Sequence, residues 1–224
     1  MRLVSGEARV VSLEALLDSE PSGESCVAIT FDDGYATVVE RAAPAMNTLG
    51  FVGTVFVTAG WVGTASRRAS DPDKGHYPGE RFMTWEDLQA LRAQGWTIGS
   101  HGVEHDDLTA VSTGRLEEEL AISRTSIAEN VGAPCEHYAY TWGLNDARVR
   151  KAVRRAGYAS AATTIHGPVT EGADRFALPR MDVTPHCTLS DFAAIVRGEW
   201  DYLGVYQRAR SFARSIRLGG KRSS

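Results

Sequence analysis

Short apolar runs alternate along the chain with longer segments of helical period. Runs rich in β-branched and aromatic residues predict buried strands, and apolar residues three or four positions apart predict amphipathic helices. The predicted strands are Val27 to Phe31, Thr54 to Thr58, Trp96 to Gly99, Tyr138 to Tyr140, Ala159 to Thr164 and Leu178 to Val183. An alternation of roughly six such units is typical of a parallel α/β fold. The sequence shows no internal repeat or clear linker, which favours one domain.

Several of the intervening helices carry their own boundary signals. The predicted helices are Tyr35 to Leu49, Thr84 to Gln94, Ser112 to Asn130, a basic helix capped by Asn145 or Asp146, and Thr188 to Val196. The tetrapeptides that begin at Thr84 and Thr188 have the spacing of capping boxes. Glycines follow the expected helix ends, where they favour a left-handed stop. We expect the helix from Ser112 to pack through Leu116, Leu120, Ile122 and Ile127.

Two stretches interrupt this alternation. Residues 61–82 form a long polar segment rich in glycine and proline, which is either a lid or binding loop or a plain surface loop. From Arg197 onward, seven basic residues stand against two acidic ones, with Tyr202, Tyr206, Ala209, Ala213 and Ile216 at helical spacing. We therefore expect a domain over residues 1–198 and a basic helix and tail over 199–224. Docking of that helix on the domain is favoured over contact with a membrane surface.

Composition narrows the function classes. The 224 residues are 43% hydrophobic and 23% charged, as in ordinary globular proteins. The net charge of −4 gives no reason to expect nucleic acid as a partner. Cys26, Cys135 and Cys187 are widely spaced and odd in number, which argues against a disulfide framework or a cysteine zinc site. Without a signal-peptide pattern or a long apolar run, we expect a cytoplasmic protein, or an exported one if the chain is excised from a longer protein. Nothing in the composition indicates the oligomeric state.

Two motifs at predicted strand ends carry candidate chemistry. Thr30-Phe31-Asp32-Asp33-Gly34 places adjacent carboxylates at the C-terminal end of a strand, where parallel α/β folds gather their active sites. Ser100-His101-Gly102-Val103-Glu104-His105 places two imidazoles four residues apart, on one face if the backbone turns helically. Two imidazoles and a carboxylate leave coordination positions open, as catalytic metal sites require. Each motif alone is weak evidence, because aspartates also cap helices and histidines are also ordinary surface residues.

In order and spacing, the two motifs together resemble the polysaccharide deacetylase family, the NodB-homology domains of carbohydrate esterase family 4. The resemblance runs from Val27 to Phe192, through AITFDDGY, TVFVTAGWVG, GWTIGSHGVEHDDLT, HYAYTWG, GYASAATT and FALPRMDV. It implies an α/β fold, a distorted (β/α)7-type barrel, with residues 1–198 as the catalytic domain. It also implies an acetylated glycan as substrate, from which N-acetyl, or sometimes O-acetyl, groups are removed.

The resemblance also implies roles for individual residues. Asp33, His101 and His105 would hold a divalent metal, with Zn²⁺ expected and Co²⁺ or another transition metal as alternatives. Asp32 would be the general base that takes a proton from water. The backbone N–H of Trp142 would stabilise the oxyanion.

The chain departs from the common family pattern at Ala139, where many members have an arginine that orients the catalytic aspartate. In a similar subgroup a later Leu-Pro-Arg supplies the guanidinium, which here is Arg180. Arg180 then either pairs with Asp32, keeping it ionised, or forms a salt bridge at the strand's exit.

A second departure concerns the acid that protonates the leaving amine, because the family's Leu-x-x-His motif has no counterpart here. His186, His166 or neither serves as that acid. Two alternatives therefore stay open: a glycan-binding module without activity, and a hydrolase of another non-peptide amide. An iron oxygenase is disfavoured, because its carboxylate ligand usually lies beside the first histidine and Asp33 lies far upstream of His101.

Overall fold

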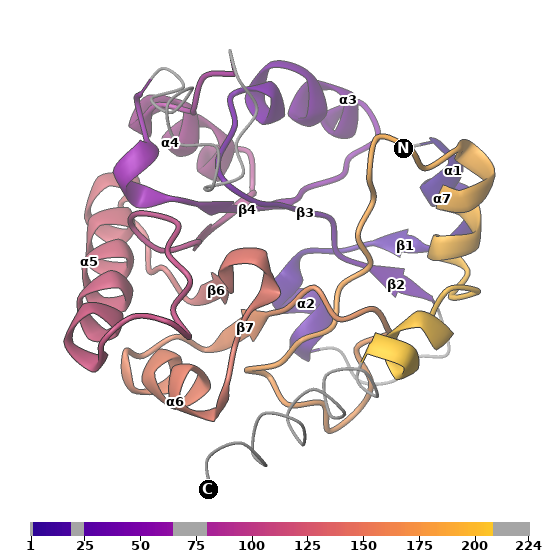
Figure 1. Cartoon of the computed structure of the whole chain (residues 1–224). Coiled ribbons are helices and arrows are strands. Elements are labelled where there is room, and N and C mark those ends of the chain that lie inside the picture. Colours follow the sequence, from indigo (N-terminus) through magenta and orange to yellow (C-terminus); the bar gives the residue numbers. More distant parts are fainter. Residues whose placement is uncertain (1, 19–24, 65–79, 208–224) are drawn as a thin grey trace, which may run out of the picture.

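The computed structural model describes residues 2–18, 25–64 and 80–207. Five parallel strands form one sheet in chain order: β3 (Thr30–Phe31), β4 (Thr54–Val57), β5 (Thr97–Ser100), β6 (His137–Ala139) and β7 (Ser160–Ala162). Two further strands, β1 (Arg9–Val10) and β2 (Cys26–Val27), form a separate parallel pair. The sheet curls into a half-barrel with helices outside it (Figure 1), which confirms the predicted distorted barrel fold.

The helical segments include the predicted helices from Tyr35, Thr84, Ser112, Asp146 and Thr188, together with short ones that the sequence does not predict. They are α1 (Arg2–Glu7), α2 (Leu13–Asp18), the π-helix η1 (Val38–Ala42), α3 (Ala43–Asn47), the 3₁₀ turn η2 (Ala59–Trp61), α4 (Trp85–Ala93), α5 (Thr113–Val131), the 3₁₀ turn η4 (Thr141–Gly143), α6 (Ala147–Arg155) and α7 (Leu189–Val196). Both predicted capping boxes form, at Thr84 and Thr188, and Asp146 caps α6. The predicted helix from Tyr35 is divided into η1 and α3 near Pro44, which lacks a backbone donor.

Three expectations need correction. Leu178 to Val183 is not a strand: only a single bridge joins Leu178 to Ala162, and Pro179 cannot donate to a ladder. The predicted strand Val27 to Phe31 is divided between β2 and β3, which belong to different sheets. Ile122 is 52% exposed, so it does not pack with the buried face of α5.

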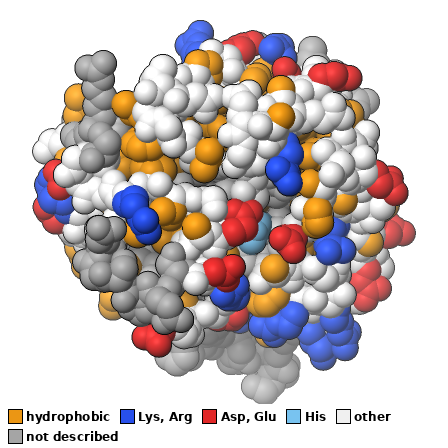
Figure 2. All heavy atoms as spheres, turned by 180° about the vertical axis from the view of Figure 1, so that it is seen from behind, with side chains coloured by type: hydrophobic (Ala, Val, Ile, Leu, Met, Phe, Trp, Pro, Cys, Tyr) orange, Lys and Arg blue, Asp and Glu red, His pale blue; other side chains and the backbone are white. Residues whose placement is uncertain are grey.

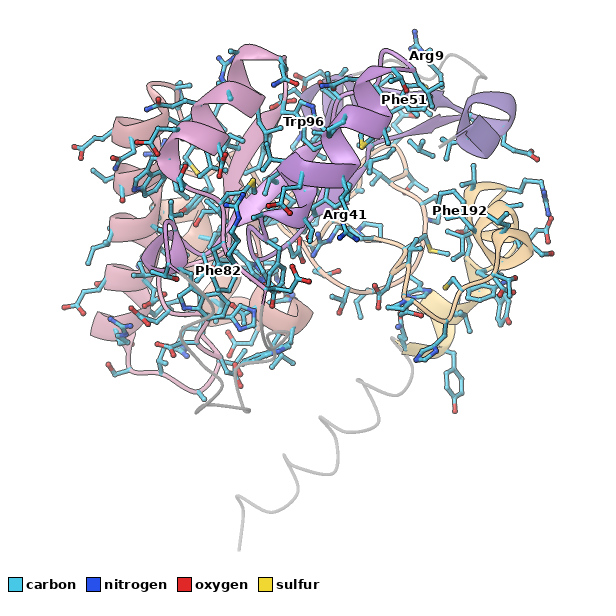
Figure 3. All side chains as sticks on the ribbon, turned by 90° about the horizontal axis from the view of Figure 1, so that it is seen from above. Arg9, Arg41, Phe51, Phe82, Trp96 and Phe192 are labelled. Carbon is cyan, nitrogen blue, oxygen red and sulfur yellow. The ribbon has the colours of Figure 1, made fainter. Side chains whose placement is uncertain are left out.

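The main core lies between the sheet and the outer helices. Val55 and Val57 of β4 are fully buried in it, whereas Phe56 between them belongs to a second cluster inside the barrel. Trp96 stacks on Phe31 with ring centroids 5.9 Å apart. In Figure 3 the labelled Trp96 and Phe51 lie on the side of the sheet that α3 covers. Alternate residues of β4 therefore serve different layers, as the pleat requires.

Helix α2 covers one end of the barrel. Its Leu13 packs on Phe56 and on Ala139, which comes from β6. Its Glu14 accepts hydrogen bonds from Thr97 Oγ1 at 2.8 and 3.0 Å and lies 3.3 Å from Nε2 of His137. Because Thr97 and His137 begin their strands, α2 lies at the N-terminal strand ends and leaves the C-terminal ends free for a site.

Helix α7 lies beside α1 (Figure 1), so the first helix of the chain packs against a helix from its last third. Residues 202–207 are helical, which agrees with the start of the predicted C-terminal helix. Ala209, Ala213 and Ile216 of that prediction, and residues 65–79 of the long polar segment, lie outside the described residues. Within the described ranges, no helix combines the length and apolar character needed to cross a membrane. Acidic and basic side chains are interspersed on the face shown in Figure 2.

Candidate active site

Three side chains with metal-ligating atoms converge at the C-terminal ends of β3 and β5. Oδ1 of Asp33 lies 3.4 Å from Nε2 of His101 and 3.3 Å from Nε2 of His105. Both histidines are buried, and Asp33 is mostly so. The structure therefore brings together the three residues that the sequence singled out as metal ligands.

The donor set and its spacing fit a single divalent ion. Two ligands about 2.05 Å from a tetrahedral metal stand about 3.3 Å apart, which matches the separations from Asp33 to the two imidazoles. Two imidazoles and one carboxylate leave the remaining positions for water and substrate. Across residues 2–18, 25–64 and 80–207, no other group of three such side chains comes this close together.

The surroundings of His101 prepare it as a ligand. Its Nδ1–H donates to the carbonyl of Ala139 at 2.8 Å, which leaves the lone pair of Nε2 directed at Asp33. Burial lowers the pKa of His101, against the opposing charges of Asp32 and Asp33. The imidazole is therefore neutral at physiological pH, and only a neutral imidazole binds a metal.

His105 is held by ring contacts. Its ring centroid lies 5.1 Å from that of Trp61 and 4.7 Å from that of Trp142, the latter edge to face. Its Nδ1 is buried, with no hydrogen-bond partner in the part of the chain that the structure describes. The indole of Trp142 therefore contacts a candidate ligand, a role that the sequence did not indicate.

Three residues of this site have a left-handed, strained backbone conformation. Asp33, His105 and Trp142 have φ values of 70°, 58° and 52°, and they are the non-glycine residues of positive φ in the described ranges. Such conformations cost about 1–3 kcal/mol each and concentrate at functional sites. The turn at Asp33 and Gly34 also explains how adjacent aspartates, which would point to opposite faces of a strand, share one site.

Asp32 is paired with Arg180. Nη1 and Nη2 of Arg180 donate to the two carboxylate oxygens at 2.7 Å each. Nη1 also donates to Thr30 Oγ1 at 3.1 Å, and Nε donates to the carbonyl of Thr163 at 2.9 Å. Burial acts to raise the pKa of Asp32, but the charge and hydrogen bonds of Arg180 outweigh it, so that the pKa lies below its ordinary value. Of the two alternatives left open for Arg180, the structure therefore has the pair with Asp32.

Ala139 stands where many family members have an arginine, and in this chain Arg180 makes the contact with Asp32 instead. The side chain of Ala139 is fully buried inside the barrel, against Leu13 and Phe56. Arg180 reaches Asp32 from the segment after Leu178, and its guanidinium carbon lies 5.5 Å from the centre of the Phe56 ring.

The two histidines considered as acids stand apart from this cluster in their contacts. His186 is exposed, and no hydrogen bond, ion pair or ring contact found within the described residues joins it to Asp32, Asp33 or His101. The backbone N–H of His166 donates to Gln207 Oε1 at 2.8 Å. The identity of the acid therefore stays a prediction.

Comparison with known proteins identifies the family. A family model described as "Polysaccharide deacetylase" matches residues 19–161, and the chain belongs to that family. It is 28% identical over 185 residues to a Bacillus subtilis (strain 168) protein named "Putative polysaccharide deacetylase YxkH". That match covers 83% of this chain and 61% of YxkH, so the chain spans less than two thirds of its relative.

Solved structures share the fold at low sequence identity. The Streptococcus pyogenes deacetylase PplD, solved in complex with acetate, superposes with a TM-score of 0.73 at 19% identity, over 87% of this chain and 82% of PplD. IcaB from Ammonifex degensii superposes with a TM-score of 0.71 at 22% identity, over 88% of this chain and 85% of IcaB. These likenesses agree with the barrel described above.

Proposed function

We propose that this protein is a metal-dependent hydrolase that removes N-acetyl groups, or O-acetyl groups, from a polysaccharide or oligosaccharide. The observation that carries the proposal is the meeting of Asp33, His101 and His105 at one point, next to the pair of Asp32 and Arg180. Membership of the polysaccharide deacetylase family supports an acetylated glycan as the substrate class.

The metal site would consist of Asp33, His101 and His105. A divalent cation there, Zn²⁺ by its donor set with Co²⁺ or another transition metal as alternatives, would polarise the acetyl carbonyl and acidify a water molecule. The described residues then have the tasks of holding the substrate carbonyl, accepting the water's proton and returning a proton to the leaving group.

Asp32 is the proposed general base. Arg180 keeps it ionised, since the guanidinium outweighs the effect of burial on its pKa, and fixes the orientation of both carboxylate oxygens. The backbone N–H of Trp142 is the proposed donor to the oxygen that becomes negatively charged. After accepting the water's proton, Asp32 is a neutral carboxylic acid, and the proposal returns that proton from Asp32 to the leaving nitrogen, or to the leaving oxygen of an O-acetyl group. His186 is not required in this scheme.

Acetate release tests the proposal. The purified chain, loaded with Zn²⁺ or Co²⁺, is expected to release acetate from N-acetylated chito-oligosaccharides or from O-acetylated xylan. Asp32→Asn is expected to lower kcat by about 10²- to 10⁴-fold, the usual contribution of a general base, with little effect on substrate binding. Asp174→Asn is the matched control, because Asp174 pairs at the surface with Arg154 and has no contact with the site.

The outcomes separate the alternatives. Glycan binding without turnover would favour a binding module of the same fold, and turnover of a different amide would favour another hydrolase. Failure to release acetate from every acetylated glycan, by metal-loaded protein, would refute the proposed activity.

A further inference from the structure

Glu119, near the middle of α5, is a fully buried carboxylate that faces the segment between the two candidate histidine ligands. Its Oε2 accepts hydrogen bonds from the backbone N–H of Val103 at 2.7 Å and of Glu104 at 3.2 Å. Its residue exposure is 0%. Glutamate is almost never fully buried unless it is paired, and the other buried residues of α5 are uncharged: Leu116, Leu120, Ser123 and Ile127.

The opposite side of the same segment is also held. The carbonyls of Gly102 and Val103 accept from the N–H groups of Ala59 and Gly60 in η2, at 2.9 and 3.0 Å. Four hydrogen bonds, two from each side, therefore fix the backbone that links His101 to His105. Glu119 packs closely against this backbone. Gly102 has a φ of 84°, and a Cβ at that position would stand 3.1 Å from Oε2 of Glu119.

Arg115 supplies the charge that makes a buried carboxylate tolerable at this place. Its Nη2 forms an ion pair with Oε1 of Glu119, one turn along α5. The same guanidinium donates to Oδ2 of Asp106, from Nη2 at 3.2 Å and from Nε at 3.4 Å. Asp106 directly follows His105, so Glu119 and Arg115 together hold both the middle and the far end of the histidine motif.

We propose that Glu119 is a positioning residue for the metal site. It sets the backbone of residues 102–104 so that the Nε2 atoms of His101 and His105 converge on Asp33. Without its oxygen, two N–H groups of this partly buried segment would lack an acceptor, and the segment would move to regain hydrogen bonds with water. The inference rests on the proposed function, because it takes His101 and His105 as ligands.

Metal affinity of the full chain tests the inference without relying on activity. Binding of Co²⁺ is measured by its visible absorption and by competition with a chelating dye. Glu119→Met keeps the volume and removes the acceptor, and we expect it to weaken Co²⁺ binding by about 10- to 100-fold, as losses of outer partners of metal ligands do. Glu119→Gln keeps an oxygen that can accept both bonds, so we expect it to recover most of that loss.

Leu120→Ala is the matched control for stability. Leu120 is fully buried next to Glu119 on α5 and belongs to the main core, so the variant is less stable but leaves the histidine segment its hydrogen bonds. We expect it to keep the wild-type Co²⁺ affinity and absorption spectrum. If Glu119→Met yields no folded protein, Glu119→Asp replaces it, since it keeps the negative charge and withdraws the oxygen by one methylene. The same loss is expected.

The results distinguish the inference from the proposed function. Wild-type protein that binds Co²⁺, together with Glu119→Met or Glu119→Asp of equal affinity, would overturn the positioning role alone. An equal loss in Leu120→Ala would also overturn it, because the effect would then follow from stability. Wild-type protein that binds no Co²⁺ would overturn the proposed metal site, and this inference with it.

Discussion

Replacing Arg180 by methionine removes both hydrogen bonds to Asp32 and keeps an unbranched side chain beside Phe56. Each bond is charge-assisted and 2.7 Å long, and such bonds contribute about 1.5–3 kcal/mol when buried. The side chains are 17% and 31% exposed, so solvent screening reduces the pair to about 2–3 kcal/mol. If that energy positions the base in the transition state, kcat/KM falls by about 30- to 150-fold.

The pH dependence gives an independent measure of the same change. The pKa of Asp32 lies below its ordinary value because Arg180 outweighs the effect of burial. Without Arg180 the effect of burial remains, so the pKa rises and the base becomes protonated at a higher pH. The acidic limb of the profile of kcat/KM against pH is therefore expected to move to higher pH.

Acetate release from an N-acetylated chito-oligosaccharide, followed over pH, provides the assay. Arg180→Lys is the matched variant, because it keeps a positive charge but not the two parallel hydrogen bonds. We expect its rate and its acidic limb to lie between those of the wild type and Arg180→Met. An Arg180→Met enzyme within about threefold of the wild-type kcat/KM, or with an unmoved acidic limb, would refute the reasoning.

Three further predictions concern metal retention, pH and backbone strain. His101→Ala and His105→Ala should each lose bound metal on dialysis, and elemental analysis showing a full complement in either variant would contradict the ligand assignment. Glu14→Gln should destabilise the fold by about 1 kcal/mol at pH 7, after allowance for exposure. Burial acts to raise the pKa of Glu14, but hydrogen bonds from His137 and Thr97 outweigh burial and lower the pKa from 4.5 to about 2. This stabilisation is present above pH 4.5 and is lost as the pH falls towards 2, so urea unfolding that shows the same difference at pH 7 and pH 2 would disprove it. Gly143→Ala should destabilise by about 1–3 kcal/mol, because Gly143 has a φ of 71° and a methyl group would stand 2.6 Å from the Thr164 nitrogen; Gly114→Ala, in open space within α5, is the control and should be neutral or stabilising in the same urea titration.

The sequence predicts those parts of the fold whose signals are local. Strands β4 and β5 and the caps of α4 and α7 are encoded within a few residues each, and the structure has them in place. The prediction of a strand from Leu178 to Val183 was wrong for a local reason as well. It relied on the apolar composition of the segment and gave too little weight to Pro179. The short elements α1, β1 and α2 have no strong pattern of their own and depend on tertiary partners: α1 contacts α7, β1 pairs with β2, and α2 packs on the barrel through Leu13.

The same distinction applies to the site. Asp33, His101 and His105 could be singled out because two motifs follow predicted strand ends, which meet at one edge of a parallel sheet. The pairing of Asp32 with Arg180, across 148 positions of sequence, was one of two alternatives that the resemblance suggested for Arg180. The contributions of Thr30, through its hydroxyl, and Thr163, through its carbonyl, need the tertiary fold, because neither residue type nor spacing marks them.

The left-handed backbone at Asp33, His105 and Trp142 has a consequence for laboratory evolution. Glycine or asparagine would relieve the local strain at each of these positions. Either change would remove a proposed metal ligand at Asp33 or His105, and at Trp142 it would remove the ring that packs on His105. A screen that rewards heat resistance alone would therefore enrich for changes at these positions first. Libraries for thermostable variants should hold all three codons constant, or select for turnover in the same round.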